Sequence, residues 1–135
     1  MAISKGKLTG VRVVLAMLAV IFAFYGIMHL FFPRQFLNMV GLAQEPLTYA
    51  LRTSLAFTGT LIICWVIAIG LALKNVLGSR SLVQAIIALL LFMGAVGIYV
   101  DFFVTKQAGQ AIIDLLFIAL GVLLILLYPW KKQAR

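Results

Sequence analysis

Hydrophobic positions fill four long stretches of the chain, and polar positions gather in the segments between them. The apolar runs cover about residues 10–32, 50–73, 82–104 and 109–129. A helix of about 20 residues rises about 30 Å, which is the thickness of the hydrocarbon core of a bilayer. The runs lack the apolar–polar alternation that marks the strands of a membrane barrel. The pattern therefore predicts an all-α fold, an integral membrane four-helix bundle that forms a single domain over residues 1–135.

The segments between the runs predict how the helices are joined. The sequences NVLGSRS and TKQAG are short turns after the second and third runs. The connection at 33–49 is longer and has apolar residues of its own, which predicts a short helix lying in the membrane interface. Pro33 suits the first turn of such a helix, and Gly41 suits the position after its end.

Composition supports the membrane class. Hydrophobic residues make up 65% of the chain and the mean hydropathy is +1.20, whereas a soluble domain is about 45–50% apolar. The single cysteine, Cys64, excludes a thiol–disulfide relay within one chain, because a relay needs two thiols. The sequence has no G-x-S-x-G, P-loop or H-E-x-x-H motif. We therefore expect no catalysis by this chain alone.

Charge is distributed unevenly between the two ends of the predicted helices. The formal net charge is +8, from eleven basic and three acidic residues. Eight basic residues lie before the first run, between the second and third, or after the fourth: Lys5, Lys7, Arg12, Lys74, Arg80, Lys131, Lys132 and Arg135. The positive-inside rule then predicts that both termini are cytoplasmic, in a multi-pass protein of the inner (cytoplasmic) membrane. The charges thus indicate topology and contact with the lipid bilayer, and no nucleic-acid partner is expected.

Small residues recur at helical spacing on each run, and a polar residue near the outer end continues each stripe. The first stripe consists of Ala16, Ala19, Ala23 and Gly26, and His29 is its next position. The polar residues that continue the later stripes are Arg52, Asp101 and Asp114. Small residues mark the faces where membrane helices pack, and charges in lipid point into the bundle or toward water. These four side chains are therefore predicted to converge at the outer mouth of the bundle.

Three interpretations of this polar cluster are open. In the first, the cluster is a structural clasp in which Arg52 bridges both carboxylates, with hydrogen bonds from His29 or Lys106. In the second, it binds an amphipathic ligand such as a quinone or a lipid headgroup. In the third, an acid carries an ion or a proton, although the inner halves of the runs hold no Asp, Glu, Lys, Arg or His apart from Arg12 at the start of the first run. Tyr25, one turn before His29, belongs to the same region and suits a core aromatic.

No metal site is predicted, and the sequence requires no cofactor. His29 is the only histidine, whereas a zinc site needs three or four nitrogen, sulfur or oxygen ligands. It is the only candidate for an axial ligand of a tetrapyrrole such as haem.

The run from Gly26 to Gly59 resembles the DoxX-like group of small four-helix membrane proteins of bacteria and archaea. The matching features are Gly26, Pro33, Gly41-Leu42, Arg52 and Gly59. The resemblance implies a four-span layout with short loops, and it marks Arg52 as a characteristic position. Some relatives are subunits of quinone-linked oxidoreductases, and many have no assigned activity.

These patterns together predict a non-catalytic accessory or structural subunit of a larger membrane assembly, which contacts quinone or lipid through the outer polar cluster. Its expected partners are other membrane subunits or further copies of itself. The alternative is a module that binds or transports a small molecule as a homo-oligomer.

Overall fold

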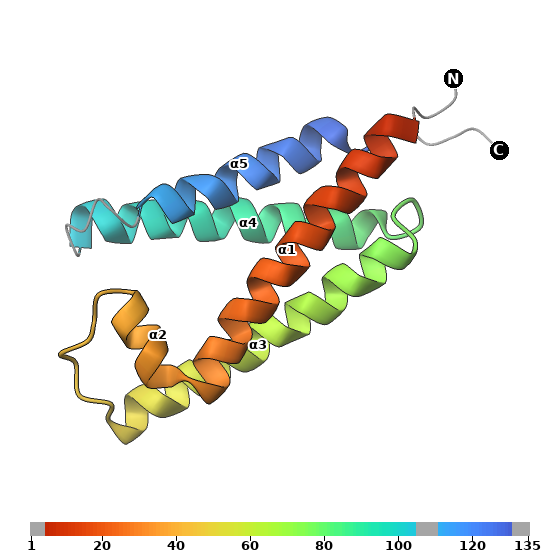
Figure 1. Cartoon of the computed structure of the whole chain (residues 1–135). Helices are drawn as coiled ribbons and strands as arrows, with labels where there is room; N and C mark the ends of the chain where they lie inside the picture. The colour runs from red at the N-terminus through yellow and green to blue at the C-terminus, as the bar shows by residue number, and fades with distance from the viewer. Residues whose placement is uncertain (1–4, 105–110, 131–135) are drawn as a thin grey trace. The chain divides into compact units, whose positions relative to one another are not determined.

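The regular structure of the described chain is entirely helical (Figure 1). The computed structural model describes residues 5–104 and 111–130. The elements are α1 (Lys5–Phe31), α2 (Pro33–Met39), α3 (Tyr49–Lys74), α4 (Arg80–Tyr99), the π-helical turn η1 (Val100–Val104) and α5 (Ala111–Leu127). The predicted all-α class is thus confirmed, with five α-helices in these residues.

Three of the helices are long and apolar enough to cross a membrane. They are α1, α3 and the continuous segment Arg80–Phe103, with 27, 26 and 24 residues. Many large apolar side chains of the described residues are also exposed. Examples are Val20, Phe57 and Phe92, which are 71%, 67% and 69% exposed. An apolar outer surface on apolar helices is stable only in lipid or against another protein. These features indicate a multi-pass membrane protein.

The third predicted helix differs from the structure near its end. The apolar run predicted a plain helix to residue 104, whereas the α-helix stops at Tyr99 and continues as η1. A π-helical turn places hydrogen bonds between residues five apart and so inserts one residue into the helical repeat. Hydrophobic periodicity cannot reveal one inserted residue, because every neighbouring position here is apolar too.

The predicted short helix after the first run is confirmed as α2. Pro33 occupies its first turn, where the missing N–H is not needed. At its other end Gly41 has a φ of 80°, a left-handed conformation that favours glycine. The Gly41 amide donates to the Asn38 carbonyl at 3.2 Å, and the Leu42 amide donates to the Leu37 carbonyl at 2.8 Å. This pair of bonds is a Schellman motif, which satisfies the last carbonyls of the helix.

Side-chain hydrogen bonds also set the boundaries of α3. The Thr48 hydroxyl accepts the Leu51 amide at 3.2 Å and caps the first turn of α3. After α3, the Asn75 side-chain oxygen accepts the Gly78 amide at 2.9 Å, which closes the turn toward α4. The sequence predicted a turn at this glycine, and the side chain of Asn75 explains its shape.

The chain divides into two compact units. Unit 1 holds the described residues of Met1–Leu15 and Ala72–Arg135, and unit 2 is Ala16–Leu71. Unit 1 is built on α4 and α5, which lie side by side (Figure 1). Its buried apolar residues on these two helices recur every three or four positions: Val83, Ile86, Ile87, Leu90, Phe117, Leu120 and Leu124. The prediction of one domain over the whole chain stays a prediction.

Unit 2 is held together by close contact between α1 and α3. A Cβ built on Gly59 of α3 would lie 3.0 Å from the Gly26 carbonyl oxygen of α1. A Cβ on Gly26 would in turn lie 2.7 Å from the Ile63 side chain. Glycine at both positions therefore permits an approach that larger residues would prevent, as the small-residue stripes predicted. Leu37 of α2, 2% exposed, is buried in the same unit.

Candidate polar site

Two carboxyl groups meet where α4, η1 and α5 pack together in unit 1. Asp101 lies in η1, and Asp114 lies in the first turn of α5. Their carboxyl groups lie close enough to interact with each other. The Asp114 carboxyl also occupies the place that a Cβ at position 97 would take, so it packs directly on the backbone of Gly97. Gly97 is thus needed to admit the acid into the helix–helix contact.

The contact brings two acidic groups together. Ionised carboxylates have only acceptor oxygens, so two carboxyl groups can share a hydrogen bond only when one of them carries a proton. Like charges that lie close together repel in surroundings of low polarity. A proton held between Asp101 and Asp114 would make this contact favourable.

In unit 2, His29 is the buried polar residue near the end of α1. Its side chain is 8% exposed, and its Nδ1 lies 2.7 Å from the Tyr25 carbonyl oxygen. The imidazole lies against the ring of Phe36 from α2, with 3.8 Å between the ring centroids. A Cβ on Gly59 would lie only 2.9 Å from the His29 Cβ. Contacts with α1, α2 and α3 together fix the orientation of this side chain.

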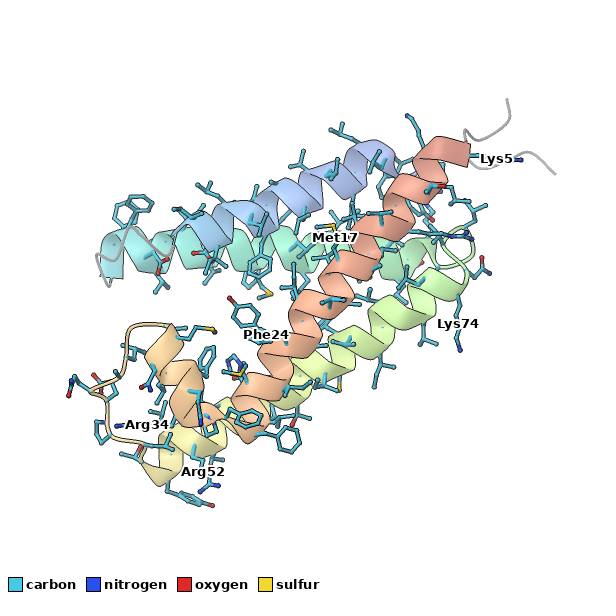
Figure 2. The ribbon with its side chains drawn as sticks, viewed as in Figure 1. Lys5, Met17, Phe24, Arg34, Arg52 and Lys74 are labelled. Carbon is cyan, nitrogen blue, oxygen red and sulfur yellow. The ribbon has the colours of Figure 1, made fainter. Side chains whose placement is uncertain are left out.

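Arginine side chains at the α2–α3 end of unit 2 differ in their contacts. Figure 2 labels Arg34 at the start of α2 and Arg52 in the first turn of α3. Arg34 donates to the Glu45 carbonyl at 2.6 Å and so ties the connecting segment to α2. Arg52 is exposed, and its backbone amide bonds the Thr48 carbonyl at 2.9 Å. The sequence analysis selected Arg52 and not Arg34, because a bond to a backbone carbonyl eleven residues away leaves no signal in the pattern of side chains.

The structure brings the predicted site residues together in two separate groups. Asp101 and Asp114 meet in unit 1, and His29 meets the Tyr25 backbone in unit 2. The Tyr25 ring itself packs edge to face with Phe36, with 6.4 Å between the centroids. Lys106 lies outside the described residues. Convergence of all four polar positions at one outer mouth, and a bridge from Arg52, stay predictions.

A second polar contact in unit 1 was not predicted in detail. The buried Tyr128 hydroxyl donates to the Val76 carbonyl at 3.0 Å, which joins the end of α5 to the turn between α3 and α4. Trp130 packs beside Tyr128 with 4.7 Å between the ring centroids, and the Arg80 guanidinium lies 5.8 Å from the Trp130 ring. A partner 52 residues away along the chain leaves no local signal in the sequence, so apolar patterning does not predict this bond.

Across residues 5–104 and 111–130, no group of three or more His, Cys, Asp or Glu side chains could hold a metal ion. Comparison with known proteins finds no match to a family model, to a curated protein or to a solved structure.

Proposed function

We propose that the chain is a four-helix protein of the cytoplasmic membrane that serves as a non-catalytic accessory or structural subunit of a larger membrane assembly. In this proposal α5 is the fourth span. It has 17 residues, all apolar except Asp114, and about 17 residues is the lower end of the length needed for a membrane helix. Contact with quinone or lipid would occur at the polar positions near the outer helix ends.

The proposed orientation rests on the basic end of unit 1. A Cβ on Gly10 of α1 would lie 3.2 Å from the Leu127 side chain at the end of α5. Tyr128 reaches the α3–α4 turn through Val76. Three chain segments therefore gather at one end of the unit: the start of α1, the α3–α4 turn and the end of α5. The first two of them carry exposed basic residues, which are Lys5, Lys7, Arg12, Lys74 and Arg80. The positive-inside rule assigns this end to the cytoplasm, with both termini inside.

The proposal rests on the contacts that the polar side chains make with neighbouring helices. The carboxyl groups of Asp101 in η1 and Asp114 in α5 meet each other, and His29 is packed between helices of unit 2. Polar side chains that make helix–helix contacts favour a structural role over a catalytic one. The resemblance to the DoxX-like group supports a subunit role and is itself part of the proposal.

Native mass spectrometry of the tagged chain, purified from its own membrane in mild detergent, tests the subunit role. We expect the chain in complexes with larger membrane proteins, at a fixed stoichiometry. Isolation of the chain alone, from membranes and from gently solubilised extracts alike, would contradict the proposal. Homo-oligomers without other proteins would favour the alternative, a module that binds or transports a small molecule.

One observation favours this alternative. Two carboxyl groups meet within one helix contact, and a membrane carboxyl group can carry a proton or an ion. A carboxyl-modifying reagent tests it, because a transported ligand bound at the pair should protect Asp114 from modification. Equal modification with and without candidate ligands would count against transport through this pair.

A further inference from the structure

The imidazole of His29 has a defined tautomer. Its Nδ1 lies 2.7 Å from the Tyr25 carbonyl oxygen, and a carbonyl oxygen can only accept a hydrogen bond. Nδ1 must therefore carry the proton. In the neutral ring, Nε2 is then a lone-pair atom that accepts hydrogen bonds and cannot donate them.

The remaining ring nitrogen is accessible from outside the unit's core. Within residues 5–104 and 111–130, every fully buried side-chain nitrogen or oxygen has a hydrogen-bond partner. The bond to Tyr25 uses Nδ1, and the described residues provide no further hydrogen bond to the His29 ring. Since Nε2 is not fully buried, the 8% of His29 that stays exposed includes this acceptor. An acceptor held in apolar surroundings without a partner costs free energy, which a ligand with a donor group would recover.

One aromatic ring lies against the His29 imidazole, and two more follow it. Phe36 lies against the imidazole at 3.8 Å, and Tyr25 packs on Phe36 edge to face at 6.4 Å. Phe24 in turn packs on Tyr25 edge to face at 5.9 Å. A further aromatic ring beside Phe36 would continue this arrangement, because aromatic rings favour offset and edge-to-face contacts.

We propose that His29 is a binding site for a membrane-soluble aromatic alcohol, whose hydroxyl donates to Nε2 and whose ring packs beside Phe36. This inference rests on the proposed contact with quinone, because the quinone pool would supply the ligand. Of a quinone couple, only the hydroquinone has a hydroxyl to donate. The site therefore selects the reduced member and rejects the quinone, whose carbonyl oxygens would face a lone pair.

Nitrogen-15 NMR of the histidine ring tests the tautomer and the site in the wild-type chain. Because the chain has one histidine, labelling that amino acid gives the signals of His29 alone. In nanodiscs we expect the pattern of a ring protonated at Nδ1. A long-chain 4-alkylphenol should shift the Nε2 signal, and the matching 4-alkylanisole, which lacks the hydroxyl hydrogen, should not. A ring protonated at Nε2, or equal shifts with both compounds, would overturn the proposal.

Equilibrium dialysis of the same two compounds gives the affinity. One hydrogen bond between neutral groups is worth about 0.5–1.5 kcal/mol, so the phenol should bind about 2- to 10-fold more tightly than the anisole. His29→Leu should remove this preference. Tyr49→Phe is the matched control, since it removes one hydroxyl from an exposed side chain of the same unit, and it should keep the preference. A preference that survives His29→Leu would overturn the proposal.

Two further outcomes distinguish other sources of ligand. A shift of Nε2 in phosphatidylglycerol nanodiscs without any phenol, absent in phosphatidylcholine, would assign the atom to a lipid hydroxyl. A visible haem absorption band lost in His29→Leu would assign Nε2 to iron. Either result overturns the aromatic-alcohol site and leaves the subunit proposal untouched, because that proposal is tested by its protein partners.

Discussion

Replacing Gly94 by alanine tests the packing on which the acidic pair depends. A Cβ at this position would lie 2.7 Å from the backbone oxygen of Asp114, whereas ordinary contact begins at 3.4 Å. A backbone oxygen inside α5 cannot turn away as a flexible side chain can. The two helices must therefore separate by about 0.7 Å at this level, and a gap of about 0.5–1 Å loses a quarter to a half of the dispersion energy across it.

Gly70→Ala is the matched control for this change. Gly70 is also inside a long helix, but a Cβ there would meet no atom within 4 Å. Both substitutions gain about 0.5–1 kcal/mol of helix propensity, and only Gly94→Ala adds the cost of overpacking, about 1–3 kcal/mol. The difference in the free energy of unfolding between the two variants therefore measures the cost of overpacking where Gly94 of α4 meets α5.

Thermal unfolding in detergent, followed by circular dichroism of the helices, measures this difference. We expect Gly94→Ala to melt at least about 4 °C below Gly70→Ala, since 1 kcal/mol shifts the melting temperature of a domain this small by about 4–8 °C. Equal melting temperatures for the two variants would refute the close approach of α4 and α5.

Three other substitutions test the remaining contacts by the same measurement. Tyr128→Phe removes the hydroxyl that donates to a buried carbonyl and should cost about 1–3 kcal/mol, so unchanged melting would argue against this bond. Asp114→Asn keeps a donor for Asp101 and should melt close to the wild type, whereas Asp114→Leu should melt clearly lower; the reverse order would exclude the shared proton. Arg52→Ala should lower the melting temperature if Arg52 bridges the acids, and an unchanged value would rule out the clasp.

Hydrophobic patterning predicted the helices well, because long apolar runs have few alternatives to a membrane helix. Proline and glycine at the ends of α2 predicted that element too, since each suits a particular backbone conformation. The helix ends were less accurate. The first run suggested a start near residue 10, whereas α1 begins at Lys5, because polar residues can extend a helix beyond its apolar part.

The candidate site was partly accessible to sequence reasoning. The small-residue stripes placed Asp101 and Asp114 in one group of four polar residues, and in the structure these two side chains interact with each other. The tautomer of His29 was not accessible, because it depends on one carbonyl oxygen and its exact distance. Which helices lie beside one another is also not encoded in periodicity, so the relation of Arg52 to the acids could only be proposed.

The contact between Asp101 and Asp114 also bears on how the chain enters the membrane during synthesis. A single charged aspartate at the centre of an inserting helix costs about 2.5–3.5 kcal/mol on the scale set by the cellular insertion machinery, and less near an end. Two helices that insert one at a time would each carry this cost. Helices that pair first can hold one proton between the two carboxyl groups and would then carry a single charge. The segment from α4 to α5 is therefore expected to leave the insertion machinery as a hairpin, with the acids already in contact.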